Sequence, residues 1–313
     1  MKIAFVFPGQ GSQTVGMLDA WADNSAVQQA IHTANQALNQ DLGALIAQGP
    51  SADLNLTTNT QPAMLLAAVA MYNAWVEAGG APPEMVAGHS LGEYSALTAA
   101  GVLELADAVR LVRVRANAMQ DAVPVGQGAM AAVLSLDDAQ IKAVCTEAAQ
   151  GEVVEPVNFN APGQIVIAGH QGAVERACEI AKTAGARRAM LLPVSAPFHS
   201  SLLKPAAEIL EQALSHIDLQ SPRIPIVNNV DVAMPTDISS IKFALVRQAW
   251  HPVRWVETIE YMRSQGVTHI VECGPGKVLA GLIKRIDKEI TVFSINDPSS
   301  LEQTLNSIHS IKN

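Results

Sequence analysis

Residues Met85-Val86-Ala87-Gly88-His89-Ser90-Leu91-Gly92-Glu93 join an apolar run to a helix-like run through the pattern Gly-x-Ser-x-Gly. The apolar run predicts a buried strand over Met85–Ala87, and Glu93–Ala100 has the character of a helix. A strand, a tight turn flanked by glycines and a helix form the context of a nucleophile elbow, whose strained turn exposes the serine hydroxyl. The sequence therefore predicts an α/β fold with Ser90 as candidate nucleophile.

The rest of the chain alternates short runs rich in Val, Ile and Phe with longer runs of helical periodicity. The predicted strands are Ile3–Phe7, Met85–Ala87, Ile224–Asn228, His269–Cys273 and Thr291–Ile295. The predicted helices are Ala26–Leu38, Pro62–Glu77 with Pro62 in its first turn, Leu105–Met119, Pro205–Ser215, Trp255–Gln265 and Val278–Ile286. Buried strands that alternate with helices predict a mostly parallel sheet flanked by helices on both faces.

Residues 126–194 have a different order of elements. The pattern predicts strand, helix, strand, strand, helix and strand, at Ala129–Leu134, Asp137 to about Ala149, Val153–Phe159, Ile165–Ala168, Ala173–Ala184 and Arg188–Val194, with a turn at 160–163 between the two middle strands. This β-α-β-β-α-β order is the ferredoxin-like arrangement. We therefore expect one large domain, formed by residues 1–125 and 195–313, with a small domain inserted at residues 126–194.

Composition excludes several classes of protein. Of the 313 residues, 49% are hydrophobic and 16% charged, which is too apolar for a disordered chain. We find no run of about 18 apolar residues, so no membrane span is expected. The cysteines Cys145, Cys178 and Cys273 lie far apart, which argues against disulfides or a zinc site and favours the reducing cytoplasm. A net charge of −9 argues against nucleic-acid binding.

A serine nucleophile needs a base, which is most often a histidine. Among eight histidines, His199 lies where the chain returns from the inserted segment, and clefts form at such junctions. An ordinary loop histidine remains the alternative for His199. His89 belongs to the turn and should point away from the Ser90 hydroxyl. No acidic residue presents itself as a third member, so a backbone carbonyl or an amide side chain could orient the imidazole.

Two segments offer groups that bind an anion. In the loop 8–13, glycines let backbone N–H groups turn toward an oxyanion, and the N–H of Leu91 at the helix start is a second candidate donor. A tight surface turn is the alternative reading of this loop. In the predicted helix Leu105–Met119, Arg113 and Arg115 diverge by about 200°. One of them can therefore point inward, although a solvated basic face is the simpler interpretation.

Taken together, these residues resemble the malonyl-CoA:acyl carrier protein transacylases of type II fatty acid synthesis over nearly the whole chain. The matching segments are 5–13 (FVFPGQGSQ), 60–63 (TQPA), 87–94 (AGHSLGEY), 157–160 (VNFN), 246–248 (VRQ) and 272–279 (ECGPGKVL). The resemblance implies a hydrolase-like α/β domain with a ferredoxin-like insert and an active site in the groove between them. It also implies a ping-pong transfer of malonyl from malonyl-CoA to the phosphopantetheine thiol of holo acyl carrier protein.

The same resemblance assigns a role to each candidate residue. These are Ser90 as nucleophile, His199 as base and then acid, the N–H groups of Gln10 and Leu91 as oxyanion hole, Arg115 as ligand of the malonyl carboxylate, and the main-chain carbonyl of Gln248 as the group that orients His199. No metal and no cofactor beyond the CoA thioester is implied. We expect a monomer in the cytoplasm whose partners are malonyl-CoA and the carrier protein.

Phe198 bears on which acyl group is accepted. Some family members have a small serine before the histidine, and in related polyketide acyltransferase domains phenylalanine there accompanies malonyl and serine methylmalonyl. The sequence therefore predicts a preference for malonyl. Two alternatives stay open, a serine esterase or thioesterase on the same scaffold and a non-catalytic docking subunit. The sequence also leaves open whether a fatty acid, polyketide or polyunsaturated lipid synthase is served.

Overall fold

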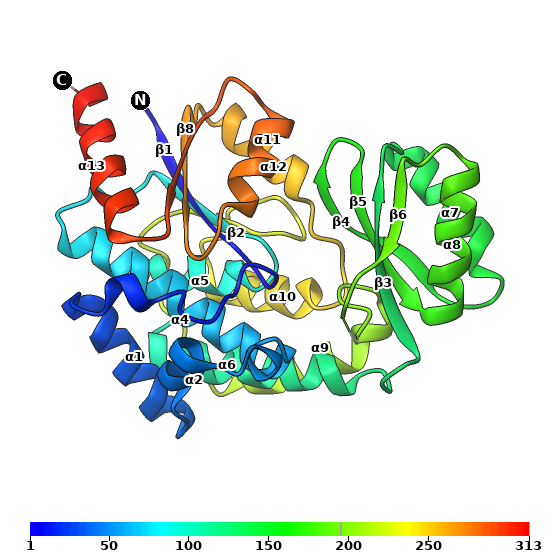
Figure 1. The fold of residues 1–313 in the computed structure, drawn as a ribbon, viewed down its shortest axis with the longest axis horizontal. Helices are drawn as coiled ribbons and strands as arrows, with labels where there is room; N and C mark the ends of the chain where they lie inside the picture. The colour runs from blue at the N-terminus through cyan, green and yellow to red at the C-terminus, as the bar shows by residue number, and fades with distance from the viewer. Residues whose placement is uncertain (195, 313) are drawn as a thin grey trace.

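The computed structural model describes residues 1–194 and 196–312. Its larger sheet contains five strands, β1 (Ile3–Phe7), β2 (Met85–Gly88), β7 (Ile226–Val227), β8 (His269–Cys273) and β9 (Thr291–Ile295) (Figure 1). Their order is β7-β2-β1-β8-β9, and every neighbouring pair is parallel. The predicted mostly parallel α/β sheet is confirmed. The strand β7 is shorter than predicted, because Asn228 turns away and donates its N–H to Ala233 O.

Helices cover both faces of this sheet. They are α1 (Ser25–Leu38), α2 (Leu42–Gln48), α3 (Ser51–Leu54), α4 (Thr57–Glu77), α5 (Gly92–Ala99), α6 (Leu105–Asp121), α9 (Lys204–Ser215), α10 (Ile238–Gln248), α11 (Trp255–Ser264), α12 (Val278–Ile286) and α13 (Pro298–Lys312). Successive side chains of a strand point to opposite faces. Ile3, Phe5 and Phe7 therefore pack with α1, α4 and α5, whereas Ala4 and Val6 pack with α11 and α12.

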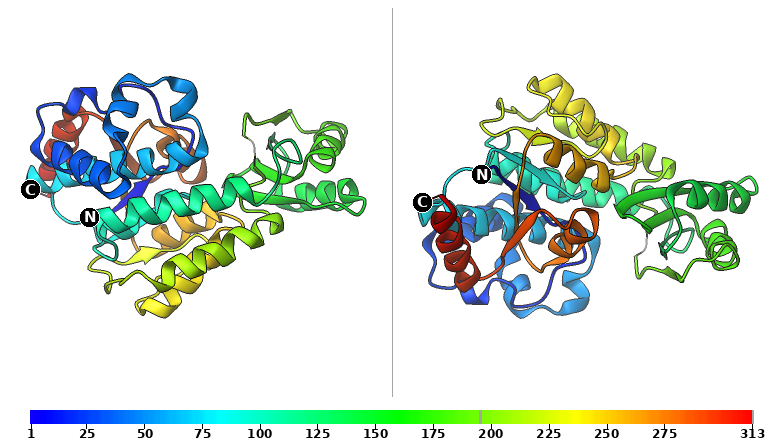
Figure 2. Two further views of the ribbon diagram at one scale, coloured as in Figure 1. Left: turned by 90° about the horizontal axis from the view of Figure 1, so that it is seen from below. Right: turned by 90° about the horizontal axis from the view of Figure 1, so that it is seen from above.

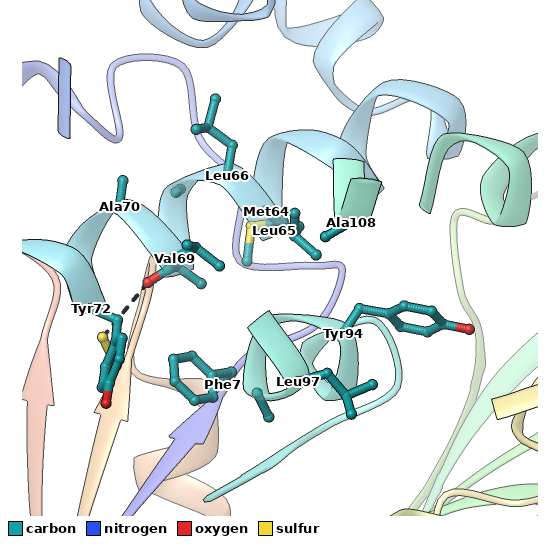
Figure 3. Close-up of a cluster of buried hydrophobic side chains, with 14 of the residues drawn as sticks. Phe7, Met64, Leu65, Leu66, Val69, Ala70, Tyr72, Tyr94, Leu97 and Ala108 are labelled. Carbon is teal, nitrogen blue, oxygen red and sulfur yellow. Dashed lines mark hydrogen bonds between the residues drawn. The ribbon is translucent and has the colours of Figure 1, made fainter. Parts of the chain in front are cut away.

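The helix α4 is the centre of the first of these layers. Figure 3 shows side chains of α4, among them Leu65 and Val69, in one buried cluster with Phe7 of β1 and Leu97 of α5. These side chains are fully buried or nearly so. Burying each one contributes about 1.5–3 kcal/mol to folding. This packing fixes α4 and α5 against β1, and both helices contribute residues to the site described below.

The start of α4 corrects one prediction. The helix begins at Thr57, so Pro62 lies inside it and not in its first turn. Proline inside a helix removes one backbone hydrogen bond. Pro62 cannot donate to Thr58 O, and in the added turn the Thr60 hydroxyl donates to Leu54 O and Leu56 O. The added turn carries Thr57 and Gln61.

The second sheet lies at one end of the molecule, as both views in Figure 2 show. It contains β3 (Gly128–Leu134), β4 (Val154–Ala161), β5 (Gln164–His170) and β6 (Arg188–Leu191), covered by α7 (Asp138–Ala149) and α8 (Gln171–Thr183). The order β4-β5-β3-β6 with antiparallel pairs is that of a ferredoxin-like sheet. A capping box between Asp137 and Gln140 opens α7, as the sequence predicts.

Several boundaries in this region differ from the prediction, among them those of β4 and β6. The strand β4 continues to Ala161, because its pairing with β5 persists to Gln164, so the turn is shorter than 160–163. The strand β6 ends at Leu191 and not at Val194, since its pairing with β3 ends there. The division into domains at residues 125/126 and 194/195 stays a prediction, and Ser195 lies outside the described residues.

Main-chain hydrogen bonds join the small sheet to the segment before α11 of the larger fold. The Val253 N–H donates to Val157 O at 2.8 Å, and the Phe159 N–H donates to Val253 O at 3.0 Å. The segment before α11 is thereby held along β4 of the small sheet. Among the described residues, no helix combines the length and the apolar character needed to cross a membrane.

Candidate active site

The turn between β2 and α5 holds Ser90 in a strained conformation. Its φ of +52° lies in the left-handed region, which non-glycine residues seldom adopt. Both flanking glycines are required by close packing. A Cβ on Gly88 would lie 1.8 Å from the carbonyl carbon of Gly92, and a Cβ on Gly92 would lie 2.0 Å from Phe7 O. The chain therefore turns tightly at the end of β2, as the motif predicts.

His199 lies against the Ser90 hydroxyl. Its Nε2 is 2.7 Å from Ser90 Oγ, and its Nδ1 is 2.8 Å from the main-chain O of Gln248, at the end of α10. Because a carbonyl oxygen only accepts, Nδ1 carries the proton and Nε2 is left to accept the serine proton. Burial, with the positive charge of Arg115, lowers the pKa of His199 to about 3. The imidazole is therefore neutral at physiological pH.

Arg115 of α6 places a buried guanidinium beside the same hydroxyl. The residue is 2% exposed, and its Nη2 lies 3.2 Å from Ser90 Oγ and 3.0 Å from Gln248 Oε1. Its Nη1 donates to Gln61 Oε1 at 2.6 Å, and the guanidinium lies 5.3 Å from the Tyr94 ring centroid. Among the described residues, no carboxylate forms a salt bridge with Arg115, and its buried Nε has no hydrogen-bond partner. The site therefore holds a positive charge beside the nucleophile.

The expected divergence of the two arginines is confirmed. Arg113 donates to Gln40 Oε1 at 2.7 Å and to Asn59 Oδ1 at 3.4 Å, neither of which lines the cavity around Ser90. Arg115, two residues on, points to Ser90. The simpler interpretation, a solvated basic face, is wrong for Arg115.

The loop after β1 lies beside the elbow. A Cβ on Gly9 would lie 2.6 Å from His89 O, so only glycine allows this approach. Gln10 and Leu91 both line the cavity around Ser90. Neither backbone N–H donates a hydrogen bond to another residue in the described part of the chain. Both amides therefore have the hydrogen-bonding capacity that an oxyanion would use.

A cavity of about 540 Å³ opens over Ser90 between the two sheets. The small sheet contributes Met130, Asn158, Asn160 and Val166 to its lining, and the larger fold contributes the elbow, the loop after β1 and α12. Phe198 also lines the cavity, directly before His199. The His89 ring bonds Asn160 at 2.7 Å and not Ser90, as expected.

A clamp that the sequence analysis missed holds the main chain of Ser90. The Ser90 N–H donates to Asn229 Oδ1 at 2.8 Å, and Gln248 Nε2 donates to Ser90 O at 2.8 Å. Asn229 Nδ2 also bonds Gly88 O at 2.7 Å. The two clamp residues, Asn229 and Gln248, both donate to Glu93 Oε2. The donors are the Asn229 N–H at 3.0 Å and Gln248 Nε2 at 3.0 Å. Burial raises the pKa of Glu93 to about 7.

Comparison with known proteins agrees with this geometry. The family model described as acyl transferase domain matches residues 4–296. The malonyl CoA-acyl carrier protein transacylase of Escherichia coli strain K12 is 56% identical over 97% of this chain and 99% of that protein. The chain belongs to the malonyl CoA-acyl carrier protein transacylase family. The Bacillus subtilis transacylase is 43% identical over 98% of this chain and 97% of its own.

Solved structures of the family agree with the fold of this acyltransferase. The acyl-carrier-protein S-malonyltransferase of Burkholderia pseudomallei 1710b superposes with a TM-score of 0.96 at 61% identity, covering 98% of this chain and 100% of that one. A second structure, of a malonyl-transacylase in complex with a type II polyketide synthase acyl-carrier protein, has a TM-score of 0.97 at 50% identity, covering 98% and 100%.

Residues that sequence reasoning missed in this acyltransferase are polar and buried. Glu93 directly follows the elbow, and a carboxylate beside an apolar run was the available signal. Asn229 carried no signal of its own, since its partners are distant in sequence, and Gln61 stood in the matching segment 60–63 without an assigned role. Among the described residues, no group of three or more His, Cys, Asp or Glu side chains could hold a metal ion.

Proposed function

We propose that this acyltransferase moves the malonyl group from malonyl-CoA to the phosphopantetheine thiol of holo acyl carrier protein, through a malonyl ester on Ser90. The observation that carries the proposal is that Ser90 Oγ contacts both the imidazole of His199 and the guanidinium of Arg115. Ser90 Oγ lies 2.7 Å from His199 Nε2 and 3.2 Å from Arg115 Nη2. A base and a fixed cation at one nucleophile suit an acyl group that bears a carboxylate. The names of the relatives support the same substrate.

In the first half-reaction, His199 Nε2 takes the Ser90 proton while Oγ attacks the thioester carbon. The carbonyl oxygen becomes an oxyanion, which the N–H groups of Gln10 and Leu91 stabilise. Collapse of this intermediate breaks the carbon–sulfur bond, and His199 returns its proton to the CoA sulfur. The Gln248 carbonyl, 2.8 Å from Nδ1, keeps the imidazole in the required tautomer and stabilises its protonated form.

Arg115 selects the acyl group. A guanidinium binds a carboxylate through two parallel N–H donors, and such charge-assisted bonds are strong in a buried site. The unpartnered Nε of Arg115 is one donor that a bound carboxylate would satisfy. An acetyl group offers no such acceptor, so the buried cation would remain unpaired. Phe198 limits the space in the same cavity and favours malonyl over methylmalonyl.

In the second half-reaction, the thiol of the carrier protein takes the place that CoA left. His199 removes the thiol proton, the sulfur attacks the malonyl ester, and the proton returns to Ser90 Oγ. The chemistry needs no metal and no cofactor beyond the thioester. Ping-pong kinetics follow from the covalent intermediate.

Malonyl transfer to a holo carrier protein tests this function. The wild-type chain, incubated with malonyl-CoA, should gain one malonyl group by intact mass, and added holo carrier protein should remove it and become malonylated. The Ser90→Ala variant should gain no adduct. An adduct on Ser90→Ala would place the nucleophile elsewhere. Equal release of CoA with and without carrier protein would instead indicate a thioesterase.

A further inference from the structure

A continuous line of hydrogen bonds leads from Arg115 to the loop after β1. Arg115 Nη1 donates to Gln61 Oε1 at 2.6 Å, and Gln61 Nε2 donates to Thr57 Oγ1 at 3.3 Å. The Thr57 hydroxyl then donates to Gln10 Oε1 at 2.7 Å. Each group in the line donates to the next one toward Gln10, and the first donor is the Arg115 cation. Hydrogen bonds in such a chain polarise one another. The line joins the guanidinium to the side chain of Gln10, a residue that lines the cavity.

The middle of this line is shielded from water. Thr57 is 6% exposed and Gln61 2% exposed, and they lie four residues apart on one face of α4. A buried hydroxyl that loses its hydrogen-bond partner is left unsatisfied, which is unfavourable away from water. Thr57 and Gln61 therefore stay in place, and a change in the orientation of one bonded group is passed to the next.

The far end of the line is Gln10, in the loop after β1. Gln10 lies between Gly9 and Gly11, and Gly11 has a φ of +115°. Gly9 is packed against His89 O, whereas a Cβ on Gly11 would meet nothing within 4 Å, so the main chain is less restrained on the Gly11 side. Gln13 Oε1 accepts the Gly11 N–H at 2.7 Å on the outer side. On the side of α4, the described side-chain contact that fixes Gln10 is the Thr57 hydroxyl.

We infer that Thr57 is a specificity-determining positioning residue, which links the carboxylate-binding guanidinium of Arg115 through Gln61 to the oxyanion-hole amide of Gln10. The inference rests on the proposed function for the roles of Arg115 and Gln10. A carboxylate bound to Arg115 fixes the plane of the guanidinium. The fixed guanidinium then orients Gln61, which orients the Thr57 hydroxyl and through it the side chain of Gln10. The oxyanion hole is therefore best ordered when the acyl group carries a carboxylate.

If this link operates, part of the selectivity for malonyl appears in kcat and not only in KM. Binding at Arg115 alone would stabilise ground state and transition state alike and change KM. Ordering of the Gln10 amide acts on the developing oxyanion, so it changes kcat. An acetyl thioester leaves Arg115 without a carboxylate and gains little from the line. Loss of the Thr57 hydroxyl should then harm malonyl turnover more than acetyl turnover.

Three variants on one helix test the link. Thr57→Val removes the hydroxyl while keeping the shape, and Thr57→Ser keeps the hydroxyl. Thr60→Val is the matched control, because Thr60 is also buried on α4 and, within the described residues, its hydroxyl bonds only the main-chain oxygens of Leu54 and Leu56. The readouts are kcat and KM for acylation of Ser90 by malonyl-CoA and acetyl-CoA, and the rate at which a neutral fluorophosphonate labels Ser90. Unfolding curves establish that each variant is folded.

For Thr57→Val we expect kcat for malonyl to fall about tenfold, the effect of one buried hydrogen bond, with KM little changed. The malonyl-over-acetyl ratio should fall with it, labelling of Ser90 by the neutral reagent should change little because the reagent carries no carboxylate, and Thr57→Ser and Thr60→Val should stay near wild type. Equal losses for malonyl and acetyl, or a Thr57→Val that behaves as Thr60→Val, would overturn the link. A wild-type chain that is acylated at Ser90 by another carboxylated thioester, such as succinyl-CoA, but not by malonyl-CoA, and in which Thr57→Val lowers that rate, would refute the proposed substrate and keep the positioning role.

Discussion

Replacement of Arg115 by alanine is the sharpest test of how this acyltransferase chooses its acyl group. The guanidinium is 2% exposed, and its acceptors Gln61, Gln248 and Ser90 are all neutral. Two charge-assisted hydrogen bonds to a carboxylate contribute about 1.5–3 kcal/mol each, and hence about 3–6 kcal/mol together. Arg115→Ala should therefore lower kcat/KM for malonyl-CoA by about 10²–10⁴-fold. The rate with acetyl-CoA should change little, because acetyl makes no contact that needs the cation.

The assay is single-turnover acylation of Ser90 by each CoA ester, followed by intact mass. Arg115→Lys keeps the charge but loses the two parallel donors, so its selectivity should lie between wild type and Arg115→Ala. Arg113→Ala is the matched control, since Arg113 lies two residues away and bonds Gln40 and Asn59 outside the cavity. Labelling of Ser90 by a fluorophosphonate shows that the nucleophile is intact.

The result that would refute this reasoning is unchanged selectivity. If Arg115→Ala is folded, is labelled at Ser90 and still prefers malonyl over acetyl by the wild-type ratio, the carboxylate is bound elsewhere. A uniform loss with both esters would instead assign Arg115 to the hydroxyl of Ser90, which it contacts at 3.2 Å.

Two further predictions concern the cavity wall and the clamp. Phe198→Ser should raise kcat/KM for methylmalonyl-CoA relative to malonyl-CoA by about 10–200-fold, the value of one methyl group in a shaped pocket; equal kcat/KM for the two esters in the wild type would contradict the role of Phe198. Burial raises the pKa of Glu93 from 4.5 to about 7, so the folded chain binds more protons than the unfolded chain between these values and loses stability as pH rises through them. Glu93→Gln keeps an acceptor and cannot titrate, so denaturation at pH 5 and pH 8 should show the variant gaining about 2 kcal/mol relative to wild type at the higher pH; an unchanged difference would show that Glu93 does not titrate there.

The parts of the fold that sequence predicts well are those decided by neighbouring residues. The strands β1, β8 and β9 have the predicted bounds, because a short apolar run between breakers fits little else than a buried strand. The capping box of α7 was equally local. Helices with weaker patterns, such as α2, α3, α10 and α13, were missed. Helix α10 matters most, since its last residue, Gln248, orients His199.

The elbow at Ser90 could be read from the chain, because the glycines, the strand and the helix that create it lie within a few residues. The partners of Ser90 could not be derived in the same way. His199 lies 109 residues away and Gln248 lies 158 residues away. His199 was a candidate only through its place at a chain junction, and Gln248 entered only through resemblance to the family. Local patterns carry no information about contacts of this separation.

The sequence by itself determined a parallel α/β sheet, a strained serine turn and an inserted β-α-β-β-α-β segment, since each follows from spacing along the chain. Only the folded chain shows which arginine of α6 turns inward, where α4 begins, and how Glu93 accepts hydrogen bonds from the main-chain N–H of Asn229 and the side chain of Gln248, the two residues that hold Ser90. These choices depend on which buried polar atoms find partners once the helices are packed. A buried donor or acceptor must be satisfied wherever its partner lies in the chain, and only the folded chain brings the two together.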